Sequence, residues 1–85
     1  MSVYVMADGS IALEGICPIE DAEALQGLIE AAPGATVDWR ACDQAHTAVI
    51  QVLLATRCPL QGPPRGEFLR AHLDAVLGRP PSERF

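Results

Sequence analysis

The sequence ATVDWRACDQAHTAVIQVLLATR, residues 35–57, is the part of the chain most informative about its fold. Residues 36–39 (TVDW) contain types that favour a half-buried strand, whereas residues 48–55 (AVIQVLLA) are apolar on nearly every side of a helix. A helix that is apolar all round is a buried one. The polar residues 41–46 (ACDQAH) predict a turn between the two elements. Because α/β sheets place binding and regulation where a strand's carboxyl end meets a helix start, this turn is the candidate functional site.

Two strand-like runs open the chain, residues 2–6 (SVYVM) and residues 10–16 (SIALEGI). The dipeptide Asp8-Gly9 lies between them, and both of its residue types tolerate the positive φ of a type I′ turn. We therefore expect an antiparallel hairpin with a turn of that type. The second strand should bend or end between Gly15 and Cys17, because a glycine interrupts its alternation.

A helix is predicted over residues 19–32, where apolar residues recur at helical spacing until Pro33-Gly34 ends the pattern. Glu20, Asp21 and Glu23 crowd its first turn. They are interpreted as solvated carboxylates that match the positive end of the helix dipole, in preference to an acidic metal site. Gly27 suggests close packing of this helix on the sheet.

The chain is less regular after Arg57. Prolines restrict Cys58–Gln61 to a short edge strand, because proline cannot donate to a sheet ladder. Residues 67–77 predict a last helix with an apolar stripe that includes His72, and Gly78 is its expected cap. Residues 79–85 form a tail with no assignment.

Composition limits the classes of partner and site. The 85-residue chain has a net charge of −5 and only six basic residues, which argues against nucleic acid or an anionic membrane. Cys17, Cys42 and Cys58 are an odd set without paired spacing, which favours reduced thiols in a cytoplasmic protein over a disulfide scaffold. We expect no signal segment and no membrane-inserted helix.

The expected order is β-β-α-β-α-(β)-α: an α/β fold with a small single-layer mixed sheet, made of a hairpin followed by β-α-β-α units and covered by helices. Residues 1–78 should form one domain. The sequence DWRACDQAHTAVIQVLL within it resembles the core of the STAS domain, found in bacterial anti-sigma-factor antagonists and in the cytoplasmic part of sulphate transporters. That family has a strand ending in Asp-Leu-Ser-Gly, then a loop and Asp-Ser-Ser/Ala-Gly-Leu at the start of an apolar helix.

When the family motif is aligned with this sequence without gaps, the aspartate of its strand falls on Asp38 and its regulatory serine falls on Thr47. His46 stands where the family has an acidic residue before the phosphorylated position, and Val49 stands where it has glycine. Thr47 keeps a hydroxyl that can accept phosphate. The resemblance covers most of the chain.

The resemblance implies a non-enzymatic module for signal transduction that docks an anti-sigma factor or histidine-kinase-like protein, with phosphorylation of Thr47 as the switch. The alternative is a cytoplasmic accessory subunit of an ABC-type lipid transporter ATPase. A homodimer is left open. The residues expected to contact a protein partner are Trp39, Asp43, His46, Thr47 and Gln51.

Each of these residues also has a purely structural interpretation. Thr47 can be interpreted as the N-cap of the helix, with its hydroxyl accepting a backbone N–H at the helix start. His46 can be interpreted as a solvated loop side chain. Trp39 suits a packing residue at the strand end, unless it is exposed as an interface hot spot. Cys42 and His46 could face a metal only if the turn were helical, and two ligands do not make a zinc site. We expect no catalytic residue, no bound metal and no cofactor.

Overall fold

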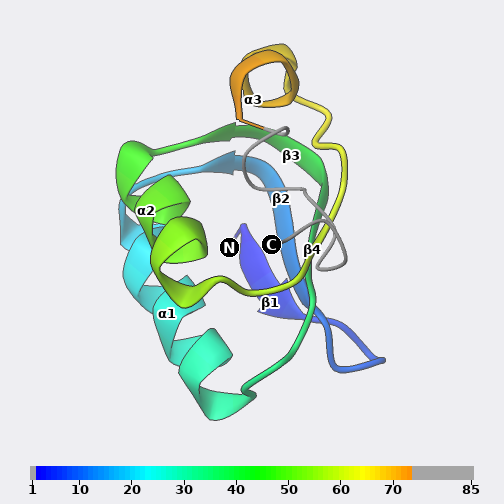
Figure 1. Cartoon of the computed structure of the whole chain (residues 1–85), viewed down its shortest axis with the longest axis vertical. Helices are drawn as coiled ribbons and strands as arrows, with labels where there is room; N and C mark the ends of the chain where they lie inside the picture. Colours follow the sequence, from blue (N-terminus) through cyan, green and yellow to red (C-terminus); the bar gives the residue numbers. More distant parts are fainter. Residues whose placement is uncertain (1, 74–85) are drawn as a thin grey trace, which may run out of the picture.

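The computed structural model describes residues 2–73 of the chain. Four strands and three helices follow one another in the order that the sequence predicts (Figure 1). They are β1 (Val3–Val5), β2 (Ile11–Cys17), α1 (Glu20–Ala31), β3 (Val37–Ala45), α2 (Thr47–Thr56), β4 (Leu60–Gln61) and α3 (Glu67–His72). The predicted continuation of the last helix beyond residue 73, its Gly78 cap and the side chain of His72 lie outside the described residues.

The four strands form one mixed sheet in the order β1-β2-β3-β4. β1 and β2 are antiparallel, with Val3 opposite Leu13, while β2, β3 and β4 run parallel to one another. The predicted fold class, a small α/β fold with a mixed sheet and covering helices, is confirmed. The predicted edge strand is present but short, because only Leu60–Gln61 pairs with the start of β3.

The hairpin between β1 and β2 is present, but its turn is not type I′. Gly9 alone has a positive φ, of 92°, and its N–H donates to the Met6 carbonyl at 3.0 Å. This is a three-residue loop with a type I turn followed by a left-handed glycine. The Asp8 carboxylate accepts the backbone N–H and the hydroxyl of Ser10 at 2.9 and 2.6 Å, and Asp8 has a negative φ.

The main departure from the sequence analysis lies in β3. Residues 41–45, predicted as a polar turn, continue the strand to Ala45. They pair with the second half of β2, where Gly15 lies opposite Cys42 and Cys17 opposite Ala45. A register irregularity follows Gly15, which has a φ of 69°, so the strand bends at the predicted glycine. Pairing with a long neighbouring strand therefore overrides the turn-like composition of this segment.

The helices α1 and α2 pack against one another and against the same face of the sheet, α1 over β1 and β2 and α2 over β3 (Figure 1). Leu25 in α1 and Leu53 in α2 are the most deeply buried leucines of the two helices. They belong to one core cluster with Leu13 and Trp39. Gly27 is exposed, and nothing lies within 4 Å of a Cβ added there, so its predicted packing role is wrong.

The segment after β4 continues along the edge of β3 in the same direction as that strand. The N–H of Gly66 donates to the Cys42 carbonyl at 2.8 Å, and α3 then contacts β3 through the buried Leu69. Within residues 2–73, no helix combines the length and the apolar character that crossing a membrane requires.

Candidate functional site

The junction between β3 and α2 is built by His46. Its backbone has φ −59° and ψ 150°, outside the helical region, and its Nδ1 accepts the N–H of Ala48 at 3.0 Å. His46 is therefore the N-cap of α2, and Nδ1 must carry no proton in this arrangement. Thr47 is the first helical residue, so the prediction that its hydroxyl caps the helix is wrong. Both side chains are exposed.

The junction lies where the carboxyl ends of β2 and β3 meet. The N–H of His46 donates to the carbonyl of Cys17, the last residue of β2, at 2.9 Å. α1 begins three residues after Cys17 and α2 begins directly after His46, so both helix starts lie at this end of the sheet. The structure thus brings His46 and Thr47 to the edge predicted from the strand-to-helix pattern.

α2 is buried on one side only. Val49, Ile50 and Leu53 point into the core, whereas Thr47, Gln51, Leu54 and Ala55 are exposed and follow one another at helical spacing. Leu54 keeps 48% of its surface exposed. We call these four residues the α2 stripe. Gln51 therefore shares a helix face with Thr47, as the expected contact surface requires, and the prediction of a helix buried all round is wrong.

The Asp43 side chain forms an ion pair with Arg65. Its carboxylate oxygens accept the Nε and the Nη2 of Arg65 at 2.7 and 2.8 Å, in a two-point ion pair between β3 and the segment before α3. The Arg65 guanidinium holds the pKa of Asp43 below its usual range. Asp43 therefore anchors that segment to the sheet, and the structure separates this role from the exposed junction at His46.

Trp39 is not available to a partner, because it is fully buried in the core. Its indole lies directly under Gly62, where an added Cβ would collide with Nε1. The indole Nε1 has no hydrogen-bond partner among the described residues. Of the two interpretations of Trp39, packing is the one that its burial supports, and its expected contact with a partner is wrong.

The acidic first turn of α1 is only partly solvated. Glu20 and Glu23 are exposed, but Asp21 retains 5% of its surface and its Oδ2 is without a hydrogen-bond partner among residues 2–73. Asp21 faces inward because it falls four residues before Leu25, on the buried stripe of the helix. The prediction of three solvated carboxylates is therefore wrong for Asp21.

A metal at Cys42 and His46 has no geometric basis. Cys42 points into the core from β3, while His46 is exposed and its Nδ1 is bound to Ala48. Within the described part of the chain, no three His, Cys, Asp or Glu side chains come together as a metal site would require.

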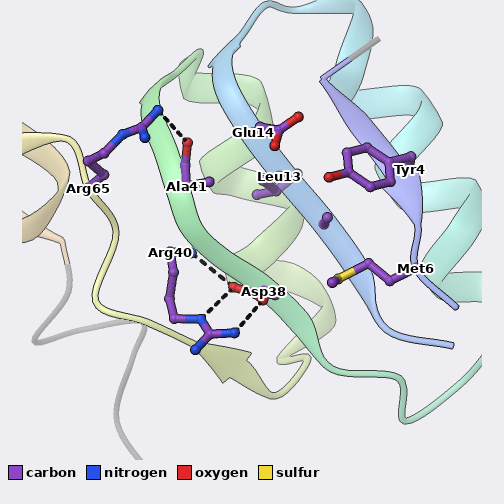
Figure 2. A pocket seen from close by; sticks show the side chains of 9 residues that line it. Tyr4, Met6, Leu13, Glu14, Asp38, Arg40, Ala41 and Arg65 are labelled. Atoms are coloured by element: carbon purple, nitrogen blue, oxygen red, sulfur yellow. Dashed lines mark hydrogen bonds and ion pairs between the residues drawn. The ribbon is translucent and has the colours of Figure 1, made fainter. Parts of the chain in front are cut away.

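The opposite face of the sheet carries a hollow that the sequence analysis did not predict (Figure 2). It encloses about 300 Å³, and Tyr4, Ala12 and Asp38, which are neighbours in the strand register, line its floor. Arg40 and Asp38 form an ion pair at 2.9 Å beside it, which lowers the pKa of Asp38. In the sequence, this ion pair was indicated only by the i, i+2 spacing of Asp38 and Arg40, which places both side chains on one face of a strand.

The hollow is a weak candidate for a binding site. It is shallow and open, and the guanidinium groups of Arg40 and Arg65 are both held by carboxylates of the chain itself. An anionic ligand would have to displace those carboxylates. The exposed junction at His46 and Thr47 is therefore the better candidate.

Comparisons of this chain with protein-family models, curated proteins and solved structures found no match.

Proposed function

We propose that this protein is a non-enzymatic regulatory module that docks a protein partner through His46 and the α2 stripe. The partner class is the one that the STAS resemblance implies, an anti-sigma factor or histidine-kinase-like protein. Phosphorylation of Thr47 is the proposed switch.

The exposed α2 stripe is the observation that carries this proposal. The α2 stripe runs from Thr47 to Ala55 and offers a hydroxyl, an amide and a large apolar side chain on one exposed helix face. Ile19, at the start of α1, adds a second large apolar side chain at the same end of the sheet, with 54% of its surface exposed. Exposed apolar groups with a polar surround are typical of protein interfaces.

The position of Thr47 suits a covalent switch. Its side chain is exposed and makes no hydrogen bond to any described residue, so a kinase could reach the hydroxyl without breaking the helix cap. A phosphate there would add a charge of about −2. The positive end of the α2 dipole would stabilise that charge, so α2 should stay folded while the surface seen by the partner changes.

Site-specific photocrosslinking tests the proposal. A photoreactive phenylalanine at Gln51 in the α2 stripe should capture a partner in a lysate, whereas the same group at Ala7, on the exposed hairpin tip, should not. An anti-sigma factor or sensor kinase captured from position 51 alone would support the proposal. An ABC transporter ATPase captured there would replace it with the accessory-subunit alternative. Equal capture from both positions would contradict a docking surface on α2.

A further inference from the structure

Two buried cysteines lie together beneath the junction. The Sγ atoms of Cys17 and Cys42 are 3.9 Å apart, and the two residues retain 1% and 0% of their surface. Cys17 is the last residue of β2 and Cys42 lies in the neighbouring β3, opposite Gly15. They are 25 residues apart in sequence, so spacing alone gave no sign of the pair.

The irregular register of β3 on β2 explains why the two thiols meet. Cys42 lies opposite Gly15, two residues before Cys17, and the register shifts between Gly15 and Ile16. Cys17 follows the alternation of the buried Ile11 and Leu13. The register shift between Ala12 and Glu14 adds one residue to β3 and turns Cys42 inward, three residues after the buried Trp39. Cys58 follows α2 and is no part of this contact.

The contact makes the two thiols unequal. The Sγ–Sγ contact with Cys42 lowers the pKa of Cys17, against the opposing effects of burial and of the Asp21 charge. The same contact, together with burial, raises the pKa of Cys42 far above its usual range. The lower pKa favours Cys17 as the attacking thiol of the pair.

We propose that Cys17 and Cys42 are a reversible redox pair that closes to a disulfide when the protein reacts with a hydroperoxide. The strands that carry them are neighbours, and a disulfide needs its sulfurs about 2 Å apart. The two Sγ atoms must therefore approach by about 2 Å for the bond to form.

The reaction balances with hydrogen peroxide as the oxidant. The Cys17 thiolate attacks one peroxide oxygen, the O–O bond breaks, and Cys17 becomes a sulfenic acid while the first water leaves. The sulfur of Cys42 then attacks the Cys17 sulfur, the S–O bond breaks, and the second water leaves as the S–S bond forms. Two thiols and one peroxide yield one disulfide and two waters, and the two thiol protons leave in the waters.

Tryptic mapping tests the pair directly, because cleavage after Arg40, Arg57 and Arg65 places each cysteine in a separate peptide. The folded protein is treated with hydrogen peroxide, alkylated and digested without reduction. Peptide 1–40 should appear linked to peptide 41–57 within monomeric protein, while Cys58 in peptide 58–65 stays alkylated. Dithiothreitol should return both free thiols.

Variants separate the pair from a general reactivity of thiols. Cys58→Ser should form the link at the parent's yield, whereas Cys42→Ser should leave a sulfenic acid on Cys17 that dimedone traps. The parent's peptide map decides the question even where a core variant fails to fold. Linkage of Cys58 to either partner, links only between chains, or three alkylated cysteines after peroxide treatment would overturn the proposal.

Discussion

The imidazole of His46 caps α2 by accepting the N–H of Ala48 on Nδ1, at 3.0 Å. The helix start is thus held by the residue that precedes Thr47, and the Thr47 hydroxyl is left exposed and uncommitted within the described chain. The capping role and the proposed switch therefore belong to adjacent residues, which lets substitutions separate them.

Substitution of the cap should lower the stability of the isolated chain. His46→Ala removes the acceptor for the Ala48 N–H and should lower the free energy of unfolding by about 0.5–2 kcal/mol. His46→Asp replaces it with a preferred capping residue and should retain the parent's stability. Thr47→Ala should stay within about 0.5 kcal/mol of the parent, because this hydroxyl caps nothing. Urea unfolding of the three variants checks the assignment, and a larger loss for Thr47→Ala than for His46→Ala would contradict it.

The two leucines at positions 53 and 54 test the orientation of α2. Leu53 retains 2% of its surface in the core, so Leu53→Ala should cost about 2–5 kcal/mol. Leu54 is about half exposed, and Leu54→Ala should cost less than about 1 kcal/mol. Equal losses in chemical denaturation would show that the helix is rotated from the arrangement described.

Gly66 and Gly27 form a second matched comparison. A Cβ at Gly66 would collide with the backbone carbonyl of Asp43, so Gly66→Ala should destabilise the fold by at least about 1–3 kcal/mol. A Cβ at Gly27 meets nothing within 4 Å in an exposed helix position. Gly27→Ala should therefore raise the unfolding free energy by about 0.4–1 kcal/mol. Thermal melts of both variants should move in opposite directions, and a stabilising Gly66→Ala would refute the packing of this segment on β3.

The ion pair of Asp43 and Arg65 should appear in the pH dependence of stability. Because Arg65 lowers the pKa of Asp43 in the folded state, the pair stabilises above the unfolded pKa of about 3.9. That contribution disappears as the pH falls through the lower pKa of the folded state. Asp43→Asn should therefore lose stability at pH 7 and converge on the parent in acid. Arg65→Gln should reproduce this profile, and parallel pH curves for parent and variants would contradict it.

The element order could be predicted from the sequence because its signals are local. The Asp8-Gly9 turn, the apolar period of α1 and the strand-to-helix change after Trp39 are each visible within a few residues. The length of β3 could not be predicted in this way. Residues 41–45 are polar in composition, and only their pairing with β2 makes them a strand.

The position of the junction between β3 and α2 could be predicted, but not its detail. His46 and Thr47 lie at the expected junction, yet the capping residue depends on a one-position difference in backbone conformation that composition does not encode. Trp39 and Asp43 lie near the junction in sequence, but neither is available to a partner there. Strand alternation buries Trp39 in the core, and Asp43 forms an ion pair with Arg65. The Cys17–Cys42 contact depends on the irregular register of β3 on β2, which is set by pairing between residues far apart in sequence.

The docking proposal is tested most directly with the partner that photocrosslinking identifies. Its binding is measured to three purified forms of the chain: the parent, Thr47→Glu and Ala7→Glu. Thr47→Glu places a carboxylate at the head of the α2 stripe, near the positive end of the helix, so the variant should stay folded. The carboxylate must be desolvated in the contact without a prepared partner, which should weaken binding at least about tenfold. Ala7→Glu makes the same change in net charge on the exposed hairpin tip.

Isothermal titration calorimetry at one salt concentration should give equal affinity for the parent and Ala7→Glu, with the loss confined to Thr47→Glu. Equal affinity for all three forms would contradict docking through the start of α2.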